Sequence, residues 1–467
     1  MSPTDRLRFL VLSGLVVLSP KGLANWSGQD VGEYDSDLAL FGSEFVPNIE
    51  NAPYHGKWVS ANRMGDALKW ATFRDALLTG QTPSVPSMAT KYGKALVAAG
   101  KEHMSISHLV GMVVPAYPTP LPPGGLPPEP PGGWQGPTTI SAGGTYSGAW
   151  ASNDTTPAVT ITTTAAVTIR DSWIRNTSTG DLIKGTNFQI RDLTLERTFC
   201  YGGTGRVFDA EGCQQITVRN CTIDRTSGIK IAATLAGSTI LVTRNKQRNI
   251  QGPAGYLSAF FKVAEVQNAT IEVSWNEIIN EYNASHPEDI ISLFKSANAT
   301  VHNNYIQHNS TPGNAYNTSS QGTITVDYPD GVGPVPHDIT INDNQMVDTV
   351  NAVLIPDSAY NVMVRDNRLI QDGKLPDGVT QMGNGYSGWA ILAGVGANCH
   401  MHNNVTGFVN RDGIRYDWHD VLAAPEGRTA EIANNTTLPD PITAAMEADE
   451  WQTWLTKLSA NGISVGA

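Results

Sequence analysis

Short apolar runs rich in Val, Ile and Thr, separated by Gly, Asn, Asp and Ser, fill the chain from about residue 139 to residue 438. Helical periodicity is missing from these runs, so they predict strands rather than helices. One pattern recurs among them: an apolar residue followed three positions later by asparagine. It occurs at Val242–Asn245, Val273–Asn276, Val301–Asn304, Ile341–Asn344, Val364–Asn367, Met401–Asn404 and Ile432–Asn435. A pattern that returns in this way predicts a repeating structural unit.

The same slot continues upstream with other residues. Ser172, Leu193 and Cys221 fill it there, which brings the number of units to ten. Two positions after the slot an apolar residue usually follows, and we expect it to point inward. These residues are Ile174, Leu195, Ile223, Ile278, Ile306, Met346 and Leu369. Neighbouring slots lie between 21 residues (172 to 193) and 40 residues (304 to 344) apart. A short minimum repeat with variable insertions is typical of a solenoid.

Asparagine has a physical reason to recur at one corner of such a coil. The chain bends sharply there, often through a left-handed conformation, which asparagine tolerates better than other non-glycine residues. Its amide can also donate to and accept from identical side chains in the coils above and below. A β-sandwich or jelly roll is the alternative, but it does not repeat the same residue at the same corner. We therefore predict an all-β fold, a right-handed single-stranded parallel β-helix of about ten coils with an internal asparagine ladder.

Composition divides the chain into four parts. Residues 1–113 have no repeat but contain helix-like patches, which predicts a small N-terminal domain. Residues 114–138 are rich in Pro and Gly and predict an extended linker. The β-helix follows over residues 139–438. Residues 439–467 have the pattern of an amphipathic helix, which we expect to cap the open end of the last coil.

Charge and cysteine content exclude several classes of protein. The 43 acidic and 31 basic residues give a net charge of −12, which disfavours a nucleic-acid partner. Only 16% of residues are charged and 40% are hydrophobic, so wholesale disorder is excluded. The four cysteines lack C-x-x-C spacing, and at most Cys200 and Cys213 are expected to pair.

An apolar run near the N-terminus, Phe9 to Leu18, is too short to span a bilayer. It fits either the apolar part of a signal peptide or a buried element of the N-terminal domain. No membrane span is expected.

The strand sequences VTIRDSWI, ITVRNCTI, ATVHNNYI and NVMVRDNRLI resemble the pectin-lyase-like superfamily of right-handed parallel β-helix proteins. The resemblance covers about 300 residues, and residues 276–307 are similar to phage-associated and uncharacterised bacterial members. It implies an extended polysaccharide bound along the outside of the solenoid. It implies no single reaction, because the superfamily contains lyases, hydrolases, epimerases and non-catalytic tailspike shafts. The N-T-D, D-D and G-H-G series of polygalacturonases is not found.

Two pairs of carboxylates are candidate catalytic groups. Glu288 and Asp289 precede an apolar strand and can serve acid–base chemistry or hold a cation. Adjacent strand residues point to opposite faces, which favours a turn-capping role instead. Asp327 and Asp330 lie in the longest insertion and can act as the two carboxylates of a glycosidase. Pro-Asp-Gly is equally an ordinary turn sequence.

A third candidate is a glycan contact region that combines aromatic, acidic and basic residues near the end of the repeats. Its members, with one aromatic residue beside Asp327, are Tyr328, Tyr386, Trp389, Arg411, Asp412, Arg415, Tyr416, Asp417, Trp418 and His419. The alternative is that these aromatics pack against the C-terminal helix. No cofactor is expected and no metal ligand is assigned.

Two functions fit this organisation. In the first, the chain is a tailspike-like virion appendage. Residues 1–113 attach it to other virion proteins, and the β-helix binds, or binds and degrades, host surface polysaccharide. In the second, it is an extracellular polysaccharide lyase or glycoside hydrolase secreted by a bacterium. The N-terminal domain and linker favour the first. Resemblance to β-helix spikes further implies a homotrimer.

Overall fold

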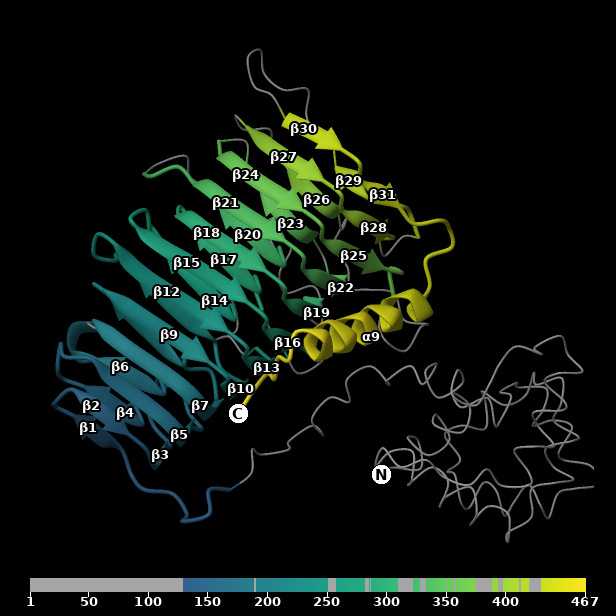
Figure 1. Ribbon diagram of the computed structural model, residues 1–467. Helices are drawn as coiled ribbons and strands as arrows, with labels where there is room; N and C mark the ends of the chain where they lie inside the picture. The colour runs from purple at the N-terminus through teal and green to yellow at the C-terminus, as the bar shows by residue number, and fades with distance from the viewer. Residues whose placement is uncertain are drawn as a thin grey trace, which may run out of the picture. The chain divides into compact units, whose positions relative to one another are not determined.

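A computed structural model describes residues 129–467, except 189, 251–257, 282–284, 286, 310–321, 328–332, 350, 357, 375–388, 394–397, 411–412 and 420–429 (Figure 1). The predicted N-terminal domain and most of the predicted linker lie outside the described residues. Within them, no helix is long and apolar enough to cross a membrane.

The described strands stack in three rows, because successive coils contribute strands to the same rows (Figure 1). The first row contains β2 (Gly144–Tyr146), β5 (Val167–Asn176), β7 (Asp192–Gly202), β9 (Gln215–Arg219), β12 (Ser238–Thr243), β15 (Ala269–Ser274), β18 (Ala297–His302), β21 (His337–Asn342), β24 (Tyr360–Arg365), β27 (Cys399–His402) and β30 (Ala430–Ala433). The long strands β5 and β7 continue into the second row. The other members of that row are β3 (Ala149–Ser152), β10 (Thr222–Asp224), β13 (Lys246–Arg248), β16 (Glu277–Ile279), β19 (Tyr305–Asn309), β22 (Gln345–Thr349), β25 (Arg368–Gln371), β28 (Val405–Phe408) and β31 (Thr436–Thr437).

The third row begins as a three-stranded sheet and continues as an eight-stranded sheet. The first sheet contains β1 (Thr138–Ile140), β4 (Val159–Ile161) and β6 (Ile183–Gly185), which is followed by the short 3-10 helix η2 (Thr186–Phe188). The second contains β8 (Phe208–Glu211), β11 (Ile229–Ala232), β14 (Phe261–Ala264), β17 (Ile291–Phe294), β20 (Ile324–Asp327), β23 (Asn351–Ile355), β26 (Trp389–Ala393) and β29 (Trp418–His419). A hydrogen bond from Ile183 N to Val207 O, 2.9 Å long, links the two sheets.

Neighbouring strands within a row pair in parallel, as β12 does with β15 and β15 with β18. Their register places like residues over one another, so Ile240 lies opposite Ile271, and Ile271 opposite Ala299. All three are buried, and alternate residues face outward. The structure therefore confirms a mostly β chain with long parallel sheets, consistent with a parallel β-helix.

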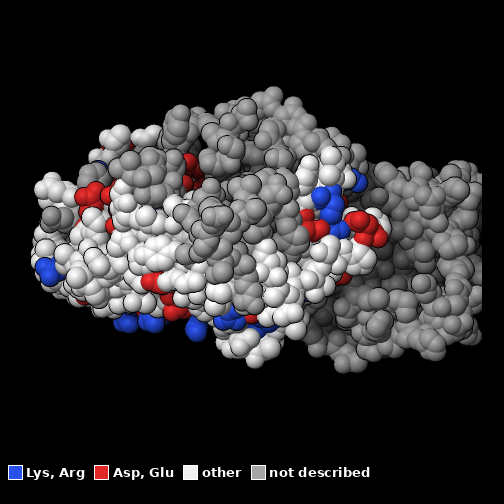
Figure 2. All heavy atoms as spheres, turned by 90° about the horizontal axis from the view of Figure 1, so that it is seen from above, with Lys and Arg blue, Asp and Glu red and all other residues white. Residues whose placement is uncertain are grey.

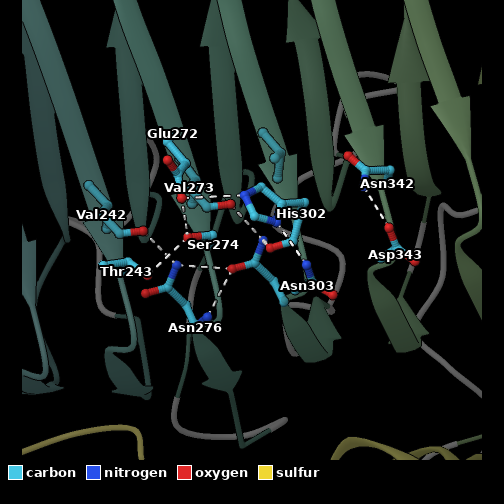
Figure 3. Close-up of polar contacts among 12 residues, drawn as sticks. Val242, Thr243, Glu272, Val273, Ser274, Asn276, His302, Asn303, Asn342 and Asp343 are labelled. Atoms are coloured by element: carbon cyan, nitrogen blue, oxygen red, sulfur yellow. Dashed lines mark hydrogen bonds and ion pairs between the residues drawn. The ribbon is translucent and has the colours of Figure 1, made fainter. Parts of the chain in front are cut away.

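The predicted asparagine ladder lies between the first and second rows. Its members are Asn245, Asn276, Asn304, Asn344, Asn367, Asn404 and Asn435. From Asn245 to Asn404, each Nδ2 donates to the Oδ1 of the next member at 2.9–3.0 Å, and the same Oδ1 accepts the backbone N–H of the donor residue. The Nδ2 of Asn276 also donates to Val242 O in the preceding coil, at 2.9 Å (Figure 3). These buried amides are thus satisfied from coil to coil.

The ladder asparagines themselves are not left-handed, contrary to prediction. The residue before each slot has the positive φ instead. These corner residues are Asp171, Arg197, Asn220, Arg244, Trp275, Asn303, Asp343, Asp366, Asn403 and Asn434. Most are Asn or Asp, the residue types that accept this conformation at least cost after glycine. At each corner, therefore, one residue adopts the left-handed conformation that bends the chain, and the next residue occupies the ladder slot.

The assignment of Leu193 to a ladder slot is wrong. Thr198 lies directly opposite Ser172, and Leu195, not Leu193, lies opposite Ile169. Both Leu193 and Leu195 are fully buried. Because apolar residues alternate along β7, the sequence is compatible with two registers, one with Leu193 and one with Thr198 in the ladder slot. The pairing of β7 with β5 and β9 selects the register with Thr198.

The predicted C-terminal helix is present as α9 (Ala444–Ala460), but it does not cap the last coil. It lies along the second row, where it contacts β22 and β25 (Figure 1). Beyond it the chain continues to the N-terminal coils, where Gly466 N donates to Arg244 O at 2.9 Å. The helix is placed there because the second row exposes apolar side chains that it buries.

The four cysteines are all free and buried, so Cys200 and Cys213 do not pair.

Candidate functional site

Charged side chains are unevenly distributed over the described surface. Seen from above, that surface is mostly uncharged; several Lys and Arg side chains lie along its lower edge, and others lie beside Asp and Glu at its right (Figure 2). On a surface with few charges, a cluster of charged side chains is a candidate for a binding site. One such cluster lies on the third row.

A column of polar residues runs along the third row at one position per strand. The register of β8, β11, β14, β17 and β20 places in line Asp209, Lys230, Lys262, Ser292 and Thr325. Their chain neighbours, such as Ile229, Ile231 and Phe261, are buried in the core. Alternation along each strand therefore directs the column away from the core, although Lys262, Ser292 and Thr325 are themselves buried. Its first members carry charge and the later two carry hydroxyl groups.

Lys262 is the cation at the centre of this column. Only 8% of its side chain is exposed. Its ammonium group lies 3.9 Å from Glu288 Oε2 and 5.4 Å from the centre of the Phe294 ring. Lys230, one coil earlier, donates to Asp209 Oδ2 at 3.0 Å. A nearly buried ammonium beside a carboxylate and an aromatic face is suited to bind oxygen atoms of a ligand.

Ser292 offers an unsatisfied hydroxyl beside this cation. It is fully buried and lies directly opposite Lys262 in the next coil. Its Oγ has no hydrogen-bond partner within the part of the chain that the structure describes. Buried hydroxyl groups are normally paired, so a group that could accept a ligand hydrogen bond is present here.

The predicted carboxylate pair, Glu288 and Asp289, points in two directions. Glu288 faces the preceding coil, where its Oε2 approaches Lys262 and its N–H donates to Ser258 O at 2.9 Å. Asp289 faces the following coil, where Oδ1 accepts from Gly322 N at 3.0 Å and from Thr325 Oγ1 at 2.8 Å. The geometry thus matches the turn-capping alternative for Asp289 and leaves Glu288 as the more exposed carboxylate.

Burial raises the pKa of Asp289 to about 7, and the hydrogen bond from Gly322 opposes that rise. A carboxyl group that titrates near neutral pH is frequent at functional sites, although structural networks produce it as well. Here both named partners of Asp289 belong to the neighbouring coil, which fits a structural network.

Asp327 ends β20 on the same row, opposite Phe294 in β17. Its carbonyl oxygen accepts the N–H of Lys295 at 2.9 Å. Asp330 and Tyr328, its predicted partners, lie outside the described residues, so the predicted carboxylate pair remains a prediction.

The predicted glycan contact region is divided by the structure. Arg415 binds Asp440 Oδ1 at 2.7 Å and Leu438 O at 2.9 Å, and its Nε lies 2.6 Å from Asp417 Oδ2. Asp417 is buried and accepts Phe408 N at 3.1 Å. Tyr416 N donates to Phe408 O at 2.8 Å. Arg415 and Asp417 therefore fasten the last coils together, and their charged groups are already engaged.

The other predicted members fall in two groups. Tyr386, Arg411 and Asp412 lie outside the described residues. Trp389, Trp418 and His419 belong to β26 and β29 of the third row, although only their backbone is described. The register that aligns the polar column continues from Thr325 through Leu354 and Leu392 to His419, so two leucines separate His419 from the polar members. The third row thus gathers predicted residues from distant parts of the sequence.

Sequence reasoning missed Lys230 and Lys262. The signal was present, because both stand between apolar residues in the short strands IKIA and FKVA. A lysine that alternates with core residues must leave a buried strand on its outer face.

Comparison with protein-family models, with curated proteins and with solved structures finds no match.

Proposed function

We propose that this chain binds a polymeric glycan along the outer face of the third row, as the β-helical part of a tailspike-like virion appendage. In this proposal the solenoid is a right-handed parallel β-helix of the pectin-lyase-like kind. Residues 1–113 attach it to other virion proteins, and the glycan is host surface polysaccharide. The observation that carries the proposal is the column from Lys230 through Lys262 and Ser292 to Thr325.

Such a column suits a linear polymer. Strands in a sheet are about 4.8 Å apart, so the column presents a polar group at regular short intervals. The Lys262 ammonium and the Ser292 hydroxyl donate to sugar oxygens, whereas the Thr325 hydroxyl already donates to Asp289. The Glu288 carboxylate accepts from sugar hydroxyls, and the Phe294 ring offers an apolar surface. The long insertions also adjoin this row, because β20 begins at Ile324, after residues 310–323, and ends before residues 328–336.

Binding is favoured over catalysis by the carboxylates that are described. A glycosidase needs two carboxylates about 5–9.5 Å apart on either side of the bond. Glu288 and Asp289 face opposite coils, and Asp289 is occupied by Gly322 and Thr325. The secreted lyase or hydrolase remains the second candidate, and Glu288 beside Lys262 is the observation that favours it.

Calorimetric titration with purified capsular or surface polysaccharide tests the proposal. Lys262→Met keeps the volume of the side chain and removes its charge, and we expect affinity to fall at least about tenfold, or about 1.4 kcal/mol. Lys246→Met is the matched control on the second row, where the side chain is 40% exposed and pairs with Glu277. Equal affinity in wild type and Lys262→Met would refute this site.

Catalysis is measured in the same preparations. Reducing ends report hydrolysis, and absorbance of unsaturated products reports elimination. Product formation that disappears in Glu288→Gln would favour the enzyme, whereas binding without product supports the appendage.

A further inference from the structure

Helix α9 is held on the second row first by apolar contacts. Trp454, Trp451 and Leu458 pack with Ile279, Tyr305 and Val347 in one cluster. The Tyr305 ring lies 5.0 Å from that of Trp451 and 6.1 Å from that of Trp454, centre to centre. The apolar half of the interface is independent of pH over the ordinary range, because burial holds the pKa of Tyr305 well above its usual value.

Charged groups form the other half of the interface. The negative charge of Glu450 in α9 is neutralised by Arg368 of β25, which binds the carboxylate at 2.6–2.8 Å. Gln345 of β22 also donates a hydrogen bond to this carboxylate at 2.9 Å. Glu447, one turn earlier, meets further carboxylates instead. Its Oε1 accepts the N–H of Asp372, and carboxylate oxygens of Asp348, Asp372 and Glu447 all lie within 4.8 Å of one another.

Full ionisation of three carboxylates at this spacing is strongly disfavoured, because two of the three are buried. Asp348 and Glu447 are each 1% exposed, and mutual repulsion in a medium of low dielectric constant is strong. Burial, and after it the charge of Asp372, raises the pKa of Asp348 to about 7, while hydrogen bonds with Glu447 and Gln307 oppose the rise. Like-charged neighbours of this kind hold a proton between them.

We propose that α9 is a pH-sensitive strap, which a proton shared between Asp348 and Glu447 fastens to the solenoid and which loosens when that proton is lost. The groups that interact with Asp348 are Glu447 of α9, Asp372 after β25 and Gln307 of β19. Tyr305 of β19 interacts with Asp348, with Glu447 and Glu450 of α9 and with Glu277 of β16. Glu450 is bound by Gln345 of β22 and Arg368 of β25. Since Arg368 is bound to Glu450, it stabilises α9 at a separate position along the helix.

The direction of the effect follows from linkage. A free aspartate titrates near 3.9, so the folded chain holds this proton more tightly than a chain with α9 released. The contribution to docking is complete below about pH 4 and is lost as pH rises through about 7. Release at alkaline pH would expose Ile279 and Val347 of the second row together with the two helix tryptophans.

Hydrogen exchange of the full chain, followed by mass spectrometry, tests the strap. We expect protection of peptides from residues 444–460, corrected for intrinsic rates, to fall at least about tenfold from about pH 5.5 to about pH 8.5. Peptides from β12 and β15 serve as internal references and should change little.

Variants separate the shared proton from general alkaline loosening. Asp348→Asn and, as a second choice if that protein folds poorly, Glu447→Gln should make protection of α9 independent of pH. Asp449→Asn, on the exposed side of α9, should keep the pH dependence of wild type.

Wild-type protection that is equal at both pH values would overturn the proposal. So would protection that follows added Ca²⁺ and its removal by a chelator rather than pH, because a cation would then neutralise the carboxylates.

Discussion

A buried asparagine of the ladder satisfies more than its own polar groups. Asn304 accepts from Asn276 through both the backbone N–H and Nδ2, and donates to Val273 O and to Asn344 Oδ1. Removing its side chain would therefore leave donors and acceptors unpaired in two neighbouring coils. Buried groups without partners cost about 1–3 kcal/mol each.

We expect Asn304→Ala to lower the free energy of unfolding by about 3–5 kcal/mol, the sum of two or three such losses. Denaturant unfolding followed by circular dichroism measures it. Asn435→Ala is the matched control, since Asn435 ends the ladder, is only half-buried, and donates to Met401 O without a further ladder asparagine beyond it among the described residues. Equal losses at both positions would contradict a role for burial.

Cys221 occupies a ladder slot without completing it. Its N–H donates to Asn245 Oδ1 at 2.9 Å, but its thiol makes only long contacts, 3.5 Å to Leu195 O and 3.4 Å to Arg219 O. Burial raises the pKa of this thiol to about 12, so it stays protonated and inert.

Cys221→Asn should therefore extend the ladder by one member. The new amide would donate to Leu195 O and to Asn245 Oδ1, and one additional net hydrogen bond contributes about 1 kcal/mol. A higher denaturant midpoint is the expected result, with Cys399→Asn, which is buried outside the ladder, expected to lower it. A lower midpoint for Cys221→Asn would mean that packing of the sulfur outweighs the ladder.

At the scale of elements, the position of α9 is set by two apolar surfaces, one on the helix and one on the second row. Trp451, Trp454 and Leu458 recur at three and four residues and so lie on one helical face. Ile279 and Val347 occupy corresponding outward positions in β16 and β22. Neither surface is covered unless the helix lies along the row.

Trp454→Ala should release α9 while leaving the solenoid folded. Loss of a fully buried tryptophan costs about 3–5 kcal/mol, and Trp454 is the most deeply buried apolar side chain that α9 places on the second row. Limited proteolysis should then cut within residues 444–460, whereas Thr453→Ala, on the exposed side, should leave the digestion pattern of wild type. Resistance of Trp454→Ala to cleavage would mean that the contacts of Glu447 with Asp372 and of Glu450 with Arg368 are sufficient to hold α9 on the second row.

At the scale of the molecule, a stack of coils in which each contacts its neighbours is rigid along its axis and free to vary in its insertions. The third row contains the polar column, and the second row is covered in part by α9. The two faces therefore separate the proposed glycan contacts from the proposed strap.

Resemblance to β-helix spikes predicts a homotrimer. Light scattering coupled to size exclusion should then give three times the chain mass of 50.0 kDa. A monomer at micromolar concentration would count against the virion appendage and favour the secreted enzyme.

Local pattern was sufficient for the features that depend on neighbours along the chain. Asparagine at a fixed distance after an apolar residue predicted every member of the ladder from Asn245 to Asn435, and the C-terminal pattern predicted α9. Alternation within a strand fixes which side chains face inward, and helical spacing fixes an apolar face, without knowledge of the rest of the fold.

Only the tertiary structure decided what depends on the adjacent coil. Pairing between β5 and β7 chose Thr198 over Leu193, since both registers bury leucine. The stacking of later coils turned Glu288 and Asp289 toward different neighbours and brought Lys262 of β14 beside Glu288. Period-two alternation specifies a face but not a partner, because partners are set by how successive coils stack. For the same reason the sequence specified a C-terminal helix, whereas the exposed apolar residues of the second row specified where it lies.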